Sequence, residues 1–163
     1  MLSTHGRYNY SPISERPDYS WPEGKRLAVY VALNVENFAW NESIESAIAP
    51  SGMHNKQSVY SWRDYGNRVG IFRIMKVLDG LGIKASVAVN AAVAERYPFL
   101  IEQVNERDWE IIANGVDMGK LHYGGLAIDE ETAQVGHALT TLRQASGQAV
   151  TGWLSPARSE SKN

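Results

Sequence analysis

The chain has 163 residues, of which 44% are hydrophobic and 21% charged, an ordinary globular composition. A formal net charge of -2 without a clustered basic excess argues against a nucleic-acid partner. The absence of Cys excludes disulfides, thiolate metal sites and a cysteine nucleophile. No apolar run is long enough to cross a membrane, and the start lacks a signal-peptide pattern. We therefore expect a cytoplasmic protein with no membrane partner.

The chain divides by composition into an arm and a single domain. Residues 1–24 are polar and aromatic, contain three prolines and show no period, which predicts an extended N-terminal arm. Its Tyr and Trp side chains would pack it on the body. The remaining residues, 25–163, contain four short apolar runs: Arg26–Leu33, Lys84–Val89, Trp109–Ala113 and Val150–Leu154. Apolar residues on both faces of the first run are typical of a buried parallel strand.

Segments of helical period separate these runs. Helices are predicted over Asn67–Leu81, from an Asn90 cap to Tyr97, from Pro98 to about Glu106, and from an Asp129 cap to about Ala145. The inner face of the last helix would comprise Ala133, Gly136, Leu139 and Leu142. Phe38–Tyr65 is predicted to be a long connection. The alternation of strands and helices predicts an α/β fold with parallel strands.

Polar side chains stand directly after every apolar run: Asn34, Glu36 and Asn37; Asn90; Asn114 and Asp117; Ser155 and Arg158. Because the carboxyl ends of parallel strands share one edge, these side chains should converge on one site. Glu36, walled by aromatic residues, could have a raised pKa and act as a general base or acid. The alternative is a solvated loop carboxylate or a partner of an arginine.

His122 is the best titratable partner for Glu36, because the ordinary pKa of imidazole lies nearest neutrality. A histidine in a loop can equally be a hydrogen-bonded structural residue. Asp117 could cap a turn and Asn114 could form one. Arg158 could bind a carbonyl oxygen or be a solvated loop residue. No serine-hydrolase elbow, zinc-protease motif or phosphate-binding glycine pattern occurs.

Four segments together resemble the polysaccharide deacetylase superfamily, defined by NodB homology. They are LNVENFAW from Leu33, SWRDYGNRVGIFRIMKVLDGLGIKASVAVN from Ser61, WEIIANG from Trp109 and GWLSPARSES from Gly152. The similarity runs from about Arg7 to the end and is nearest to the allantoinase-like and cyclic-imide-hydrolase-like branch. It implies parallel βα units forming part of a distorted (β/α) barrel. It also implies hydrolysis of carbon–nitrogen bonds other than peptide bonds.

The resemblance places the family's catalytic base on Glu36 and its three metal ligands on Asn37, Asn114 and Met118. Amide and thioether groups are poor ligands for Zn²⁺, so we expect no tightly bound metal cofactor, with weak divalent binding left open. The family's arginine position falls near Leu154 or Ser155, which displaces Arg158 along the loop. Some allantoinase-like members are thought to act without metal.

The leading hypothesis is a metal-independent hydrolase of a small amide, cyclic amide or N-acetylated sugar. Glu36 would deprotonate water, and His122 or Asp117 would orient it or protonate the leaving nitrogen. The oxyanion would be held by Asn37, Asn114 and Arg158, and a planar ring by Trp40 and Tyr123, with Trp62 more simply a packing residue.

Two alternatives remain. The chain could be a non-catalytic relative whose degraded motifs form a small-molecule or carbohydrate pocket. It could also be part of a larger assembly, because family members continue through further βα units and this chain stops shortly after its fourth apolar run. A longer polypeptide, a homo-oligomer or a partner chain would then complete the barrel.

Overall fold

The computed structural model describes residues 8–40 and 56–163, without the side chains of residues 56–59. In these ranges β1 (Ala32–Val35), β2 (Ser86–Val89) and β3 (Glu110–Ala113) form a parallel sheet in the order β1-β2-β3. An isolated parallel bridge from Ala113 to Trp153 extends the sheet beyond β3. The strand order therefore follows the chain order.

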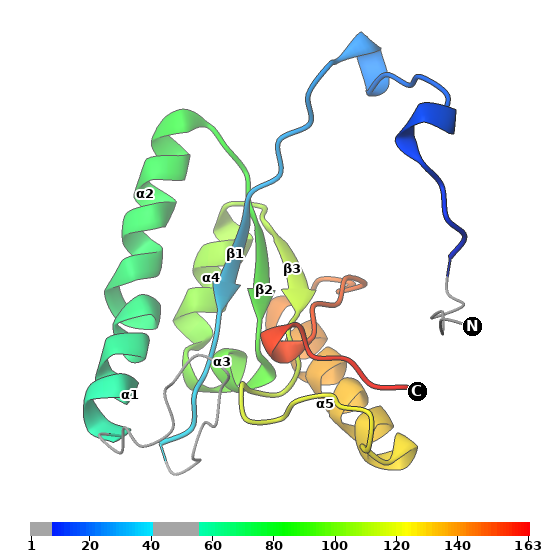
Figure 1. The fold of residues 1–163 in the computed structure, drawn as a ribbon. Helices are drawn as coiled ribbons and strands as arrows, with labels where there is room; N and C mark the ends of the chain where they lie inside the picture. The colour runs from blue at the N-terminus through cyan, green and yellow to red at the C-terminus, as the bar shows by residue number, and fades with distance from the viewer. Residues whose placement is uncertain (1–7, 41–55) are drawn as a thin grey trace.

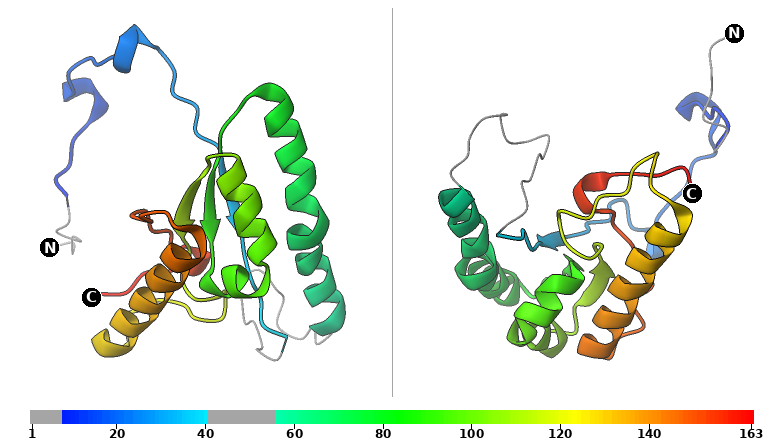
Figure 2. Two further views of the ribbon diagram at one scale, coloured as in Figure 1. Left: turned by 180° about the vertical axis from the view of Figure 1, so that it is seen from behind. Right: turned by 90° about the horizontal axis from the view of Figure 1, so that it is seen from below.

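Helices connect the strands and gather along one face of the sheet (Figure 2). They are α1 (Lys56–Tyr65), α2 (Ile71–Leu81), α3 (Ala91–Arg96), α4 (Pro98–Glu106) and α5 (Ile128–Ser146). A π-helical turn, Gly66–Gly70, joins α1 to α2 in one long rod (Figure 1). Sequential parallel strands with helices on one face form part of a (β/α) barrel and not a doubly wound sheet. This confirms the predicted fold class.

The core lies between the sheet and the helices. All four residues of β2 are buried, because strands flank β2 on both sides and helices cover it. Met75 and Leu78 of α2, one helical turn apart, are also buried. Gly82 and Gly147 end α2 and α5 in the left-handed conformation, which favours glycine. The predicted stops of both helices are confirmed.

The first predicted strand, Arg26–Leu33, is wrong in its position. β1 begins only at Ala32, and Leu27 and Val29 are about three-quarters exposed. The reason lies in the neighbouring strand. β2 pairs with Ala32–Val35, and the Ser86 amide bonds to the Val31 carbonyl, so the segment before Val31 has no described strand beside it. Apolar composition alone did not fix the strand.

The helical segments also need corrections. The connection predicted over Phe38–Tyr65 ends in a helix, because α1 begins at Lys56. Asp129 does not cap α5. The cap position is Ala127, and no side chain bonds there. Of the predicted inner face of α5, Leu142 is buried and Leu139 is half-buried against the core, whereas Ala133 and Gly136 are exposed and Ala138 is buried instead.

The segment before β1 extends away from the sheet (Figure 1). Residues 8–31 contain only the short 3₁₀ turns Ile13–Glu15 and Pro22–Gly24. Tyr10 and Tyr19 are exposed, and Tyr19 contacts Trp21 edge-on, with 6.1 Å between ring centroids. The predicted packing of these aromatic residues on the body is therefore wrong. None of the helices in the described ranges is long and apolar enough to span a bilayer.

Candidate active site

The loops that follow the strands are bonded to one another at the carboxyl edge of the sheet. The Met118 amide, after β3, donates to the carbonyl of Asn37, after β1, at 3.0 Å. The Ala91 amide, after β2, donates to the Gly115 carbonyl at 3.0 Å. A Cβ on Gly115, whose φ is +65°, would lie 2.4 Å from Pro156. The predicted convergence of separate loops is therefore present.

Asn90 is the central tie of this edge. Its side chain is fully buried, and its Oδ1 accepts a hydrogen bond from the Asn37 amide at 2.8 Å. Its Nδ2 donates to the Asn114 carbonyl and lies 4.0 Å from the sulfur of Met118. Asn90 stands at the cap position of α3 as predicted, but its side chain makes no capping bond. We call Asn37, Asn90, Asn114 and Met118 the strand-end cluster.

The side chain of Asn114 is the anomaly of this cluster. It is 1% exposed, and neither its Oδ1 nor its Nδ2 has a hydrogen-bond partner among the described residues. A buried amide without partners costs roughly 1–3 kcal/mol, so such groups usually serve a ligand or an ordered water. Among the described residues, the Asn114 side chain therefore has an unused donor and an unused acceptor at the carboxyl edge of the sheet.

The three positions that correspond to metal ligands do not provide a metal site. Asn37, Asn114 and Met118 offer two amides and a thioether, whereas Zn²⁺ prefers imidazole, thiolate and carboxylate. The described residues also contain no group of three His, Cys, Asp or Glu side chains placed to hold a metal ion. These three side chains do not suit a zinc ion, and the chemistry proposed below involves no metal-bound step.

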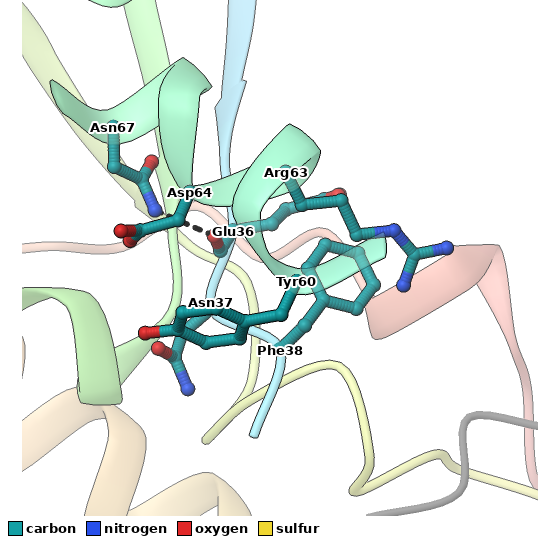
Figure 3. Close-up of a pocket in the computed structure, with 7 residues that line it drawn as sticks. All are labelled: Glu36, Asn37, Phe38, Tyr60, Arg63, Asp64 and Asn67. Carbon is teal, nitrogen blue, oxygen red and sulfur yellow. Dashed lines mark hydrogen bonds between the residues drawn. The ribbon is translucent and has the colours of Figure 1, made fainter. Parts of the chain in front are cut away.

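Glu36 borders a small cavity next to the cluster (Figure 3). The lining residues are Glu36, Asn37, Phe38, Tyr60, Arg63, Asp64 and Asn67. Asn67, buried in the π-helical turn, donates to the Glu36 carbonyl at 2.9 Å and holds this loop in place. The enclosed volume is about 10 Å³, room for roughly one water molecule. The cavity can hold a water beside Glu36 but not an organic substrate.

Arg63 lines the same cavity as Glu36 and interacts with its carboxylate electrostatically. Its guanidinium carbon lies 3.8 Å from the centre of the Phe38 ring, a cation–π contact. Burial lowers the pKa of Arg63, while the Glu36 carboxylate acts in the opposite direction. One guanidinium nitrogen, Nη1, is buried and has no partner among the described residues. Glu36 therefore has the arginine neighbour that the alternative interpretation anticipated.

Behind this cavity, Asp64 links α1 to the start of α4. It accepts hydrogen bonds from the Tyr97 hydroxyl and from Arg68. Burial raises the pKa of Asp64, but these two hydrogen bonds outweigh it and the pKa is lowered. Burial and the bond to Asp64 raise the pKa of Tyr97 to about 12. Asp64 is thus an ionised anchor of the helix that carries Arg63.

His122 lies elsewhere and has another partner. It is 4% exposed, and its Nδ1 lies 2.6 Å from Oε1 of Glu131 on α5. Its ring meets Trp153 edge-on, with 5.6 Å between centroids. Both His122 and Glu131 line an open groove of about 800 Å³, which does not include Glu36. The sequence predicted Glu36 as the partner of His122. The structure shows that this is wrong and that the partner is Glu131.

The remaining predicted residues lie outside both cavities. Asp117 accepts a hydrogen bond from the Gly119 amide at 2.7 Å, the turn-forming alternative noted above. Arg158 is exposed with a φ of +54°, and Tyr123 is 56% exposed. Trp40 packs edge-on against Tyr60 with 5.1 Å between centroids. The exposed Trp62 lies on α1. His54, a further candidate histidine in the predicted connection Phe38–Tyr65, falls outside the described residues.

Sequence analysis missed the roles of Glu131 and Asn67 and the true role of Asn90. Asn90 had the residue type and position of a helix cap, which concealed its long-range bonds. Glu131 had the ordinary signature of an acidic first helical turn. No local sequence pattern predicts these contacts. Asn90 bonds to Asn37, 53 residues away, and Glu131 contacts His122, 9 residues away.

Parallel βα units with polar strand-end loops define an α/β protein that forms part of a barrel. The family model described as Polysaccharide deacetylase matches residues 51–163. This chain belongs to the polysaccharide deacetylase family.

Solved structures agree with this fold. The Puue allantoinase matches with a TM-score of 0.75 at 22% identity, over 94% of this chain and 55% of that one. A putative polysaccharide deacetylase from Mycobacterium smegmatis matches with a TM-score of 0.67 at 25% identity, over 85% and 46%. A CE4 family pseudoenzyme from Bacillus anthracis matches with a TM-score of 0.56 at 14% identity, over 80% and 36%. The chain thus spans about half the length of the first two. No curated protein matches it by sequence.

Proposed function

We propose that this chain carries the active-site edge of a hydrolase that cleaves a carbon–nitrogen bond other than a peptide bond, without a tightly bound metal. The substrate class would be a small amide, a cyclic amide or an N-acetylated sugar. The observation that carries the proposal is the bonded convergence of the strand-end loops, where the positions that the resemblance assigns to metal ligands hold amide and thioether groups. Family membership and the family name support the reaction class.

The proposed step needs water, a base and oxyanion donors. Glu36 takes a proton from the water held in its small cavity, while the water oxygen forms a bond to the substrate carbonyl carbon. The amides of Asn37 and Asn114 donate to the oxyanion, and Nδ2 of Asn114 has no competing acceptor among the described residues. The carbon–nitrogen bond then breaks, the proton on Glu36 passes to the leaving nitrogen, and a carboxylic acid and an amine result.

The test is a hydrolysis assay with allantoin, hydantoins, succinimides and N-acetylated sugars. We expect Glu36→Gln to lower kcat on the cleaved substrate by about 10²-fold or more, since loss of a general base removes a factor of 10²–10⁴. Glu102→Gln, on the exposed face of α4, is the matched control and should keep full turnover. Unchanged turnover in Glu36→Gln would remove Glu36 from the mechanism.

A second candidate function has its own observation. The amide and thioether groups at the positions of the family's metal ligands also suit a non-catalytic small-molecule or carbohydrate-binding protein. A compound from the same panel that raises the melting temperature but yields no product would favour this function. Product formation that depends on Glu36 would exclude it.

We also propose that further βα units complete the barrel, from a longer polypeptide, a second copy or a partner chain. The match to about half of the related structures supports this, as do the exposed side chains of Leu27, Val29 and Tyr30 just before β1. Light scattering beside intact-mass measurement tests it. A stable active monomer of 18.1 kDa would contradict completion by a second chain.

A further inference from the structure

The contacts of Glu131 determine which nitrogen of His122 carries the proton. Oε1 of Glu131 faces Nδ1 of His122 at 2.6 Å, and a carboxylate oxygen can only accept there. The other oxygen, Oε2, accepts from the side-chain amide of Asn163 at 2.6 Å. The hydrogen bonds of Asn163, Ser161 and His122 lower the pKa of Glu131, which keeps it ionised near neutrality. Neutral His122 must therefore carry its proton on Nδ1.

This tautomer leaves Nε2 of His122 as an unprotonated acceptor. Nε2 is buried and has no hydrogen-bond partner among the described residues. His122 as a whole is 4% exposed. An acceptor that is shielded from water and has no hydrogen-bond partner is unfavourable in free energy. A ligand that donates a hydrogen bond to Nε2 recovers that free energy.

The surroundings of His122 can accommodate such a ligand. The groove that His122 lines has a volume of about 800 Å³, within the range of small-molecule sites. Ile128, Val135 and Trp153 supply apolar surface, and Thr132 and Ser155 supply hydroxyl groups. The loop of His122 is bonded to the last loop of the chain, because the His122 amide donates to Ser159, and the nearby Pro156 packs on Gly115.

We propose that the groove at His122 is a binding site for a small uncharged molecule with an N–H or O–H donor, which bonds to Nε2 while Glu131 fixes the tautomer. Glu131 is a positioning residue in this site, since it acts through His122. The use of a cyclic amide as the test ligand rests on the proposed function. The binding site and the tautomer of His122 do not depend on that function.

The first test measures the tautomer directly by ¹⁵N NMR of the His122 ring. In the neutral ring we expect Nδ1 protonated and Nε2 unprotonated. In Glu131→Gln, the amide oxygen would accept from Asn163, so the amide nitrogen would donate a hydrogen bond to Nδ1. The neutral ring would then carry its proton on Nε2. Glu130→Gln loses the same charge one residue away, where the carboxylate accepts a hydrogen bond from Gln134, and should leave the tautomer unchanged.

The second test asks whether the groove binds a donor. Hydantoin carries ring N–H groups, and 1,3-dimethylhydantoin has the same ring without them. We expect hydantoin to shift the Nε2 resonance saturably and to bind at least tenfold more tightly than the dimethyl compound. The Glu131→Gln change should weaken hydantoin at least tenfold while Glu130→Gln does not, as expected for loss of one hydrogen bond.

These readouts are separate from turnover, so a loss of hydrolysis does not affect them. A neutral wild-type His122 protonated on Nε2 would overturn the proposal, as would an unchanged tautomer in Glu131→Gln. Equal binding of the two hydantoins, or no saturable shift with hydantoin, would also overturn it. The wild-type tautomer and the paired ligands keep the test decisive should Glu131→Gln fail to fold.

Discussion

The strand-end cluster and the His122–Glu131 pair lie in linked loops of one chain but are built differently. The cluster contains three neutral amides and a thioether. The side chain of Asn90 bonds to main-chain groups, and that of Asn114 has no partner among the described residues. The His122 pair joins an imidazole to a carboxylate, and its free group is a ring nitrogen. One region offers hydrogen-bond groups that do not ionise, and the other offers a proton acceptor set by a charge.

This chemical difference predicts different tasks for the two regions. Neutral amides keep their donors at every pH and can stabilise charge that develops on a substrate. A histidine held by a carboxylate accepts from a ligand only in the right tautomer. We therefore expect changes in the cluster to act on stability and turnover independently of pH, and changes at Glu131 to act through ionisation.

The largest expected effect is the loss of Asn90. Replacing Asn90 with Ala leaves the Asn37 amide and the Asn114 carbonyl without partners at the strand edge, which should lower the free energy of unfolding by about 3 kcal/mol. Urea denaturation measures this. Asn105→Ala is the matched control, because Asn105 also makes two side-chain bonds, to Ser146 and Gln148, but is exposed. Its loss should cost about 1 kcal/mol, and equal costs would deny Asn90 its role.

A smaller effect of opposite sign is expected at Asn114. Leu has nearly the shape of Asn and removes a buried amide that has no partner, so Asn114→Leu should raise the free energy of unfolding by about 1 kcal/mol. The same change should abolish turnover, because the proposed oxyanion donor is lost. Thermal unfolding and the hydrolysis assay measure the two halves. A destabilised Asn114→Leu would show that the amide has partners in the protein.

The smallest effect is the acid sensitivity of Glu131. Its pKa is lowered in the folded protein, so the stabilisation is present above the unfolded value of about 4.3 and is lost as the pH falls through the folded value. Between about pH 5 and pH 3, the unfolding midpoint of the wild type should therefore fall more than that of Glu131→Gln, in which His122 and Asn163 face a neutral amide. The wild-type acid slope should persist in Asn114→Leu. A parallel decline in Glu131→Gln and wild type would show that Glu131 is not stabilised as an anion.

Hydrophobic periodicity and helix-terminating glycines predicted much of the fold. The spacing of Met75 and Leu78 and the glycine at position 82 identified α2 and its end, and the apolar runs located β2 and β3 to within two residues. The same signals failed before β1, where strand formation depends on a neighbouring backbone and not on composition. The fourth run likewise gives only the bridge at Trp153.

The candidate site was predicted by strand order and missed in its pairings. Polar residues after parallel strands had to meet at one edge, and Asn37, Asn90 and Asn114 do. Which side chain bonds to which depends on loop paths between elements, and sequence alone does not encode these locally. His122 thus seemed to suit Glu36, while the actual partner was a glutamate in the first turn of α5.

The most direct measurement restores the missing metal ligands. In the triple variant N37D/N114H/M118H, the strand-end loops would present a carboxylate and two imidazoles, a set that Zn²⁺ prefers. We expect calorimetry to show stoichiometric zinc binding to this variant and none to the wild type, with circular dichroism confirming that both are folded. A folded variant that binds no zinc would show that the three positions do not converge. Equal binding by the wild type would show that the amides and thioether suffice as ligands, contrary to a metal-independent site.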